Sequence, residues 1–258
     1  MTGDREIVQR DESKSHSPRL SHRLQHPPHL ECRPSLEVQG EDRHFPVGRI
    51  WCVGRNYAAH AREMEADSGA PENPDPPFFF LKPATALVSG GGPVPYPPRT
   101  TLLHHEVELV VALGHGGRDI PQGHTLDLVY GYGVGFDLTR RDVQADAKRG
   151  RKPWSLAKGF DGSAPCSLLV PCSRIGHPRR GRITATVNGE LRQDGDLSEQ
   201  VWAVPQLIAE LSGQLELLPG DLLFTGTPAG VGPLHVGDRA VATIEGVASL
   251  TIDVTAPI

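Results

Sequence analysis

The sequence predicts one mainly β domain of the α+β class, built from mixed β-sheets. Three observations support this fold class. Glycine (29) and proline (24) are frequent among the 258 residues, which favours short strands and turns over long helices. Most apolar segments are short, and only a few segments have the periodicity of a helix. The sequence also contains no internal repeat, which favours a single domain.

The composition also limits the class of protein and its partners. A formal net charge of −5 gives no electrostatic reason to expect a nucleic acid or an anionic membrane. No apolar run reaches the ~18 residues that a membrane-spanning helix requires, and there is no signal-peptide pattern. The four cysteines lack C-x-x-C spacing, which favours reduced thiols in a cytosol. We therefore expect a cytoplasmic protein with no nucleic acid and no membrane as partner.

Residues 1–46 differ in composition from the rest of the chain. Histidine and proline are frequent there, acids and bases are nearly balanced, and the apolar residues show almost no periodicity. This composition predicts a disordered or loosely attached extension and leaves 47–258 as the folded domain. A mitochondrial transit peptide is the alternative, but four acidic residues among the first twelve count against it.

The first predicted elements are a strand at 50–53 and a helix at 58–65, with Asn56 as the candidate N-cap. His60 and Glu63 lie three residues apart on this helix, so they share a face and can form a hydrogen bond. A solvated surface pair is the alternative to a catalytic one.

The most informative stretch is an acidic strand. It follows the apolar strand 78–81, which ends at Lys82, a residue that either extends to solvent or contacts an anion. Apolar and polar residues alternate along 104–111, which puts Glu106 and Glu108 on one face. Neighbouring carboxylates repel unless a cation lies between them, and such ligands suit Mg²⁺, Mn²⁺ or Ca²⁺. The alternative is an amphipathic strand with a solvated outer face.

A longer strand at 129–138 is next. Glycine occupies every second position from Gly131 to Gly135, so another backbone or a ligand can approach closely. These glycines do not form G-x-G-x-x-G, so a dinucleotide-binding fold is not supported. Asp137 lies at the end of the strand, before a short helix at 140–149. Three polar side chains follow one side of that helix: Arg141, Gln144 and Lys148.

The remaining elements are short strands and one helix. Lys158 lies between apolar residues, an environment that either lowers its pKa or holds a structural salt bridge. Asn188-Gly189 predicts a hairpin turn, and 198–211 an amphipathic helix. The glycine-rich loop 226–232 offers free backbone N–H groups that can bind a carboxylate, and two strands at 240–254 end the domain.

Seven short motifs follow one another along the chain. They are GRNYAAHAREM (54–64), FLKP (80–83), HHEVEL (104–109), DLTRRDVQ (137–144), WSLAK (154–158), VNGELR (187–192) and TGTPAGVG (225–232). In order and spacing they resemble the fumarylacetoacetate hydrolase superfamily, in its small single-domain branch with acylpyruvase and oxaloacetate decarboxylase. The resemblance covers about residues 48–256.

The resemblance implies a mixed β-sheet roll of the fumarylacetoacetate hydrolase C-terminal domain type, usually a homodimer, with Mg²⁺ or Mn²⁺ in its site. Matching positions imply three groups of site residues. The metal ligands would be Glu106, Glu108 and Asp137. The catalytic residues would be His60 and Glu63, on a lid helix, and Lys158. The substrate-binding residues would be Lys82, Arg141, Gln144 and Thr227.

Two features depart from the family pattern. Arg140 stands where the family usually has a small residue, which would alter the rim of the pocket. The extension at 1–46 matches no family motif.

The expected activity is cleavage of the C–C bond of 3-acylpyruvates, which are 2,4-dioxo acids, to pyruvate and a carboxylic acid. His60, oriented by Glu63, would activate water, and Lys158 would stabilise the enolate. The same enolate would support decarboxylation of oxaloacetate. Two different functions also fit the motifs: isomerisation, hydration or decarboxylation of 2-hydroxy-dienoate diacids, and non-catalytic binding of a 2-oxo acid.

Overall fold

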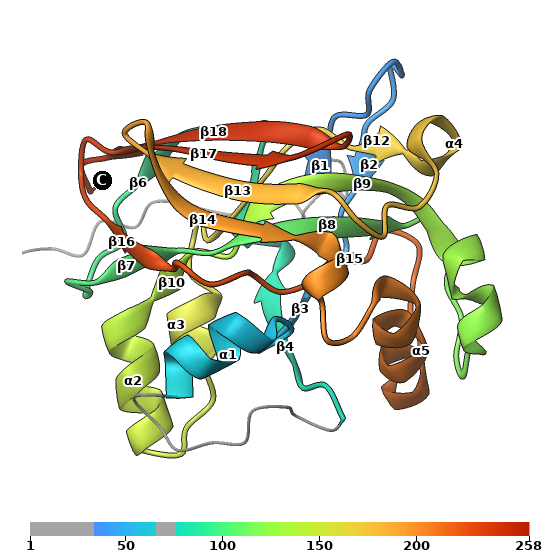
Figure 1. Ribbon diagram of the computed structural model, residues 1–258, viewed down its shortest axis with the longest axis horizontal. Helices are drawn as coiled ribbons and strands as arrows, with labels where there is room; N and C mark the ends of the chain where they lie inside the picture. The colour runs from blue at the N-terminus through green and yellow to red at the C-terminus, as the bar shows by residue number, and fades with distance from the viewer. Residues whose placement is uncertain (1–33, 66–75, 258) are drawn as a thin grey trace, which may run out of the picture. The chain divides into compact units, whose positions relative to one another are not determined.

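Strands are the main elements of this computed structural model, which describes residues 34–65 and 76–257 (Figure 1). The largest sheet has the order β4 (Phe79–Pro83), β3 (Arg49–Val53), β15 (Leu222–Phe224), β8 (Val107–Leu113), β9 (Val129–Phe136), β11 (Ala164–Cys166) and β5 (Leu87–Ser89), and β12 (Val170–Pro171) also pairs with β9. The second sheet has the order β14 (Glu190–Asp196), β13 (Arg182–Val187), β17 (Arg239–Ile244), β18 (Ala248–Thr255) and β6 (Gly92–Pro95). The small sheets are β10 (Thr139–Arg140), β7 (Leu103–His105) and β16 (Gly232–Leu234), and β1 (Ser35–Leu36) with β2 (Phe45–Pro46).

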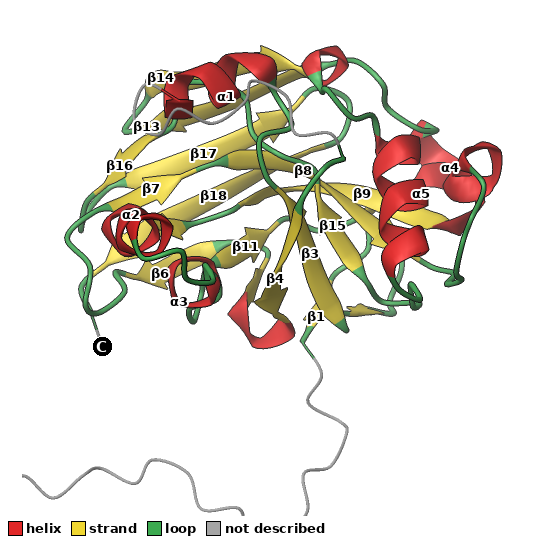
Figure 2. Cartoon of the chain, turned by 90° about the horizontal axis from the view of Figure 1, so that it is seen from below, coloured by secondary structure: helices red, strands yellow, loops and turns green. Residues whose placement is uncertain are grey.

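The helices gather at the two ends of the sheets. They are α1 (Ala58–Glu65), α2 (Arg141–Arg149), α3 (Ser155–Lys158), α4 (Cys172–Ile175) and α5 (Val204–Gln214), with 3₁₀ turns η2 (Ala84–Ala86), η3 (Gln122–Leu128) and η4 (Leu197–Glu199). Figure 2 shows α1, α2 and α3 toward one end and α4 and α5 toward the other. Among the described residues, no helix is long and apolar enough to cross a membrane. Parallel pairs such as β3–β15 occur beside antiparallel pairs such as β8–β9, so the predicted class, mainly β with mixed sheets, is confirmed.

The strand β8 is buried on both faces. Val107, Leu109 and Val111 belong to a large apolar cluster that it shares with the second sheet. Val110 and Ala112 belong to a smaller cluster on the opposite face of the largest sheet. A solvated outer face for this strand, which the alternating pattern also allowed, is therefore wrong. Any carboxylate on the face of Val110 is enclosed by protein.

Residues 34–46 are part of the folded domain. β1 and β2 pair in antiparallel fashion, and the side chains of Leu36 and Phe45 are buried in the smaller apolar cluster. The predicted boundary between 46 and 47 is therefore wrong for this stretch. Its apolar residues have no regular period because they reach the core from short strands and a turn. The rest of the predicted extension, 1–33, lies outside the described residues.

The alternating glycines of β9 have the close neighbours that the sequence predicts. A Cβ atom on Gly131 would lie 2.5 Å from the carbonyl oxygen of Val170, and one on Gly135 would lie 2.9 Å from that of Pro165. Real Cβ atoms do not approach other atoms this closely, so the backbone of β11 and β12 can lie against β9 only because side chains are missing there.

Local signals predicted the hairpin and the range of α1 correctly, but they gave one helix start and one N-cap incorrectly. Asn188 and Gly189 both have positive φ, as a tight turn between β13 and β14 requires. The helix expected at 198–211 begins at Val204, because Pro205 has no N–H group and fits only in the first turn. Asn56 does not cap α1: its amide group bonds the backbone of Trp202 and Thr225 and so joins three segments.

Candidate active site

Three buried carboxylates form the centre of the candidate site. Glu106, Glu108 and Asp137 are at most 4% exposed, and one oxygen of each lies within 4.8 Å of the others. Glu108 lies on β8 opposite Gly135 of β9, and Asp137 follows β9 two residues later. The antiparallel register of these strands thus brings together carboxylates that are about thirty residues apart in the sequence.

Glu106 and Asp137 occupy equivalent places at a junction of two sheets. Glu106 separates β7 from β8, and Asp137 lies between β9 and β10. β8 pairs with β9 in the largest sheet, whereas β7 pairs with β10 in a small one. The backbone N–H of Asp137 donates to the carbonyl oxygen of Glu106 at 2.8 Å. Both carboxylates are therefore held where the two strands pass from one sheet to the other.

Three cations surround these carboxylates. The ammonium of Lys158 lies 2.7 Å from Glu106 Oε2 and 2.6 Å from Asp137 Oδ2. The ammonium of Lys82 lies 2.8 Å from Asp137 Oδ1, and the guanidinium of Arg141 pairs with Glu106. Burial of several negative charges would be strongly unfavourable without such partners. Lys158 therefore forms a structural ion pair, one of the two environments that its sequence neighbours allow.

The carboxylates fit a hard divalent cation such as Mg²⁺ or Mn²⁺. These ions prefer oxygen ligands, and three carboxylates from three backbone positions converge here. Asp137 Oδ1 accepts no hydrogen bond, although it is buried and Lys82 lies beside it, so it keeps an unused acceptor position. Glu108 accepts one backbone hydrogen bond, from Gly226 at 2.7 Å, through Oε2.

The two glutamates of the acidic strand have opposite pKa shifts. Burial raises the pKa of Glu108 well above its ordinary value, and the nearby charges of Asp137 and Glu106 raise it further. Burial also acts to raise the pKa of Glu106, but Lys158 and Arg141 outweigh it and lower this pKa well below its ordinary value. Glu106 is therefore ionised at neutral pH, whereas Glu108 binds a proton more readily.

His60 and Glu63 form the pair that the helical spacing predicts. His60 Nδ1 lies 3.3 Å from Glu63 Oε2, and His60 lines the same pocket as the carboxylates. The backbone N–H of Gly230 donates to both oxygens of Glu63 at 3.2 Å. Burial acts to raise the pKa of Glu63, but these hydrogen bonds lower it below its ordinary value. The glycine-rich loop thus binds carboxylates through backbone N–H groups, as its sequence predicts.

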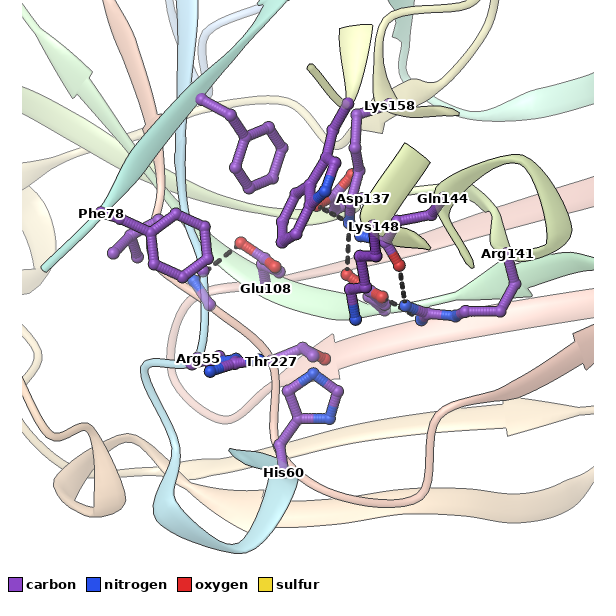
Figure 3. A pocket seen from close by; sticks show the side chains of 16 residues that line it. Arg55, His60, Phe78, Glu108, Asp137, Arg141, Gln144, Lys148, Lys158 and Thr227 are labelled. Atoms are coloured by element: carbon purple, nitrogen blue, oxygen red, sulfur yellow. Dashed lines mark hydrogen bonds and ion pairs between the residues drawn. The ribbon is translucent and has the colours of Figure 1, made fainter. Parts of the chain in front are cut away.

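Three of the four expected substrate-binding residues line the pocket. Arg141 donates to Gln144 Oε1 at 2.6 Å, and both lie on the face of α2 that points toward the carboxylates (Figure 3). Thr227 lines the pocket from the glycine-rich loop, and its hydroxyl accepts a hydrogen bond from Gln193 at 2.7 Å. Lys82 does not line the pocket: it is buried beneath Asp137 and donates to the carbonyl oxygen of Leu138 at 3.1 Å. Lys82 lies on β4 opposite Ile50 of β3, and it is 1% exposed.

Arg140 does not form the rim of the pocket. Its guanidinium lies over the ring of Phe160, 4.5 Å from the centroid. Burial lowers the pKa of Arg140 from its ordinary value. The departure from the family pattern at this position therefore affects packing beside the site and does not add a charge to the pocket lining.

Several pocket residues were missed by sequence reasoning. The lining also contains Arg55, Phe78, Phe80, Lys148 and Trp154. Lys148 had a usable signal, its place on the same helical side as Arg141 and Gln144. Gln193, which contacts the pocket residue Thr227 without lining the pocket itself, had no such signal, because it lies on a strand with exposed polar neighbours. It is nevertheless fully buried and accepts hydrogen bonds from the N–H of Val107 and from His105.

A buried carboxylate cluster, a lysine bridge and a His–Glu pair around one pocket form the arrangement of an enzyme active site. The fumarylacetoacetate (FAA) hydrolase C-terminal family model matches residues 49–255. The chain therefore belongs to the fumarylacetoacetate hydrolase family.

Known relatives carry related functions. The chain is 42% identical over 219 residues to the mitochondrial oxaloacetate tautomerase of Bos taurus. This alignment covers 82% of this chain and 97% of that protein. A crystal structure of fumarylpyruvate hydrolase from Pseudomonas aeruginosa, in complex with Mn²⁺ and pyruvate, matches with a TM-score of 0.84 and 45% identity, over 90% of this chain and 99% of that one. The structure of 5-carboxymethyl-2-hydroxymuconate delta-isomerase from Mycobacterium smegmatis matches with a TM-score of 0.71 and 33% identity, over 83% of this chain and 80% of that one.

Proposed function

We propose that this protein is a divalent-metal-dependent hydrolase that cleaves 3-acylpyruvates to pyruvate and a carboxylic acid. The observation that carries the proposal is the His60–Glu63 pair in one pocket with the three buried carboxylates. The similarity to a fumarylpyruvate hydrolase that binds Mn²⁺ and pyruvate supports the same reaction class.

Glu106, Glu108 and Asp137 would hold Mg²⁺ or Mn²⁺. The bound ion would act as a Lewis acid toward the 2-oxo acid end of the substrate. Arg141 and Gln144 project from α2 beside Glu106, where they would bind the carboxylate of that end. The hydroxyl of Thr227, which accepts a hydrogen bond from Gln193, would donate a hydrogen bond to a substrate oxygen.

His60 would be the general base. Because Nδ1 faces Glu63, that nitrogen carries the proton and Nε2 is left as an acceptor. Nε2 would take a proton from water as the water oxygen attacks the C4 carbonyl. The C3–C4 bond then breaks, its electron pair passes to the pyruvate enolate, and C3 takes up the proton that His60 holds. Lys158, at the floor of the pocket, would stabilise the negative charge of the enolate.

A second candidate is tautomerisation or decarboxylation of oxaloacetate. The 42% identity to an oxaloacetate tautomerase over nearly its whole length favours it. These reactions use an enolate of the same kind but need no attack by water.

A third candidate is isomerisation, hydration or decarboxylation of 2-hydroxy-dienoate diacids, which the likeness to a delta-isomerase supports. Non-catalytic binding of a 2-oxo acid is the fourth.

One steady-state experiment separates the first, second and fourth of these functions. Rates with acetylpyruvate and with oxaloacetate would be measured after exhaustive chelation and again after addition of Mg²⁺ or Mn²⁺. Metal-dependent release of pyruvate and acetate from acetylpyruvate is the expected result. Turnover of oxaloacetate alone would favour the second candidate, and turnover of neither, with tight binding of pyruvate, would favour a binding protein. Undiminished hydrolysis without any metal would contradict the proposed ligand set.

The proposal includes a cytoplasmic homodimer without nucleic-acid or membrane partners. Cys52, Cys166 and Cys172 are free thiols, which is consistent with a reducing compartment. Light scattering and cell fractionation would test these two expectations.

A further inference from the structure

Gln193 is buried on a strand where an apolar neighbour is exposed. Gln193 is 0% exposed, whereas Leu191, two residues earlier on β14, is 51% exposed. Residues two apart on a regular strand share one face, so this pattern requires an irregularity. One extra residue of β14, Arg192, stands between the pairs that Leu191 and Gln193 form with β13. Such a β-bulge redirects the side chains that follow it, and bulges of this kind are frequent next to active sites.

The amide group of Gln193 uses its full hydrogen-bonding capacity. Its Oε1 atom accepts from the N–H of Val107 at 3.0 Å and from His105 Nδ1 at 2.9 Å. Its Nε2 atom donates to Thr227 Oγ1 at 2.7 Å and to the carbonyl oxygen of Pro228 at 2.8 Å. A backbone N–H can only donate and a backbone carbonyl can only accept. Val107 and Pro228 therefore fix which end of the amide is oxygen and which is nitrogen.

The orientation of this amide decides the role of the Thr227 hydroxyl. Because Nε2 can only donate, Thr227 Oγ1 must accept, and its own proton points elsewhere. No described residue accepts a hydrogen bond from this hydroxyl, and Thr227 lines the pocket. The proton is thus left for a ligand.

The glycine-rich loop cannot easily move away from Gln193. A Cβ atom on Gly230 would lie 2.0 Å from the carbonyl oxygen of Arg192, and one on Gly195 would lie 2.7 Å from the side chain of Pro228. Real Cβ atoms do not approach other atoms this closely, so glycine at both positions lets the loop lie directly against β14. Gln193 lies in the middle of this contact.

We propose that Gln193 is a positioning residue that fixes the hydroxyl of Thr227 as a hydrogen-bond donor to the bound 2-oxo acid. Gln193 does not line the pocket, so it would act only through Thr227. An ionised glutamate at this position would have the same shape but would present an oxygen to Thr227. The hydroxyl would then donate to the glutamate and offer the ligand only a lone pair. This inference rests on the proposed function for the identity of the ligand as a 2-oxo acid.

A double-mutant cycle on pyruvate binding tests the role without catalysis. Calorimetry with Mn²⁺ present would measure the Kd of pyruvate for Gln193→Glu, Thr227→Val and the double variant of the full chain. Gln193→Glu should weaken binding by a factor at least about tenfold larger when Thr227 is present than in the Thr227→Val background. An effect of the added charge acts in both backgrounds and cancels in this comparison.

Two further variants control the cycle. Thr227→Ser keeps the hydroxyl, so Gln193→Glu should weaken pyruvate binding in this background as much as in the wild type. Asp194→Asn changes the exposed side of the same strand and should leave the Kd unchanged. If Gln193→Glu does not fold by circular dichroism, Gln193→Met takes its place. It removes the donor without adding a charge, and the same dependence on Thr227 is expected.

The outcomes separate this role from the proposed function. Equal weakening by Gln193→Glu with and without the Thr227 hydroxyl would overturn the proposal, because a merely structural residue does not act through that hydroxyl. This conclusion would hold even if acetylpyruvate is hydrolysed. A loss of affinity that depends on the hydroxyl, with no hydrolysis of acetylpyruvate, would support the positioning role and overturn the proposed reaction.

Discussion

At the residue scale, Lys82 and Lys158 bind different oxygens of Asp137 and have different surroundings. Lys158 lines the pocket, whereas Lys82 is enclosed and also donates to the carbonyl oxygens of Leu138 and Lys158. We therefore predict that Lys82 positions Asp137, whereas Lys158 is the lysine that lines the pocket.

Lys82→Met should therefore reduce stability and not only activity. Removal of Lys82 leaves Asp137 Oδ1 buried without its cation and two carbonyl oxygens without their donor, although Lys158 still pairs with Asp137 Oδ2. We therefore expect a loss of about 3–5 kcal/mol in the free energy of unfolding. Urea denaturation would measure it, with the exposed Lys152→Met as control. Added Mn²⁺ should restore part of the loss, because a divalent ion would neutralise Asp137. A loss below about 1 kcal/mol would contradict the positioning role.

The pKa of Glu108 predicts how metal affinity depends on pH. In the protein without metal, burial and the neighbouring carboxylates raise this pKa, so the side chain keeps its proton to a higher pH than an ordinary glutamate. A metal ion binds the ionised form and displaces the proton. Affinity for Mn²⁺ should therefore fall as the pH is lowered through the raised pKa, while Glu106, whose pKa is lowered, stays ionised.

Calorimetric titration with Mn²⁺ from pH 8 to pH 5 would measure this dependence and the proton release that accompanies it. Glu108→Gln should bind the ion more weakly and with a smaller pH dependence, since it has no proton to lose. Affinity that is constant across this range would show that Glu108 is ionised throughout.

His60 should affect the two proposed reactions differently. His60→Ala removes the base that activates water, so kcat/KM for acylpyruvate hydrolysis should fall by ~10²–10⁴. Oxaloacetate turnover should fall less, because no water attacks there. Lys158→Ala should reduce both reactions, since both pass through an enolate. Equal losses for His60→Ala on the two substrates would leave His60 as a residue that only positions the substrate.

At the element scale, the pair β1–β2 makes a testable contribution to the core. Leu36 and Phe45 pack under the largest sheet, and burial of each such side chain contributes ~1.5–3 kcal/mol. A chain that starts at Val47 should therefore unfold at a clearly lower temperature than one that starts at Pro34. Thermal unfolding followed by circular dichroism would compare the two. Equal melting temperatures would mean that the domain does not need this pair of strands.

The elements also show which parts of the site the sequence could predict. Carboxylates, lysine and the His–Glu pair lie in short motifs, where spacing along one strand or helix decides which side chains share a face. Lys82 and Gln193 depend instead on pairing between strands distant in the sequence, which decides whether a side chain points inward. The two faces of β8 show the same limit. Alternation of apolar and polar residues predicted which side chains share a face, but it could not show that other elements cover both faces.

At the scale of the whole molecule, the class and the family were predictable, and the boundary was not. Motifs spread over residues 54–232 identify one fold because their order must match as well as their content. The N-terminal boundary rested on composition alone, which does not detect two short strands with only a few apolar residues.

The junction at Glu106 and Asp137 has a consequence for the dynamics of the described domain. Each residue lies where a strand leaves the largest sheet and enters the small sheet of β7, β10 and β16. An ion held by both would link the two sheets as a crosslink does, and would restrict twisting of one against the other. Ion binding would then slow the hydrogen exchange of backbone amides along both sheets, including amides that lie far from the pocket.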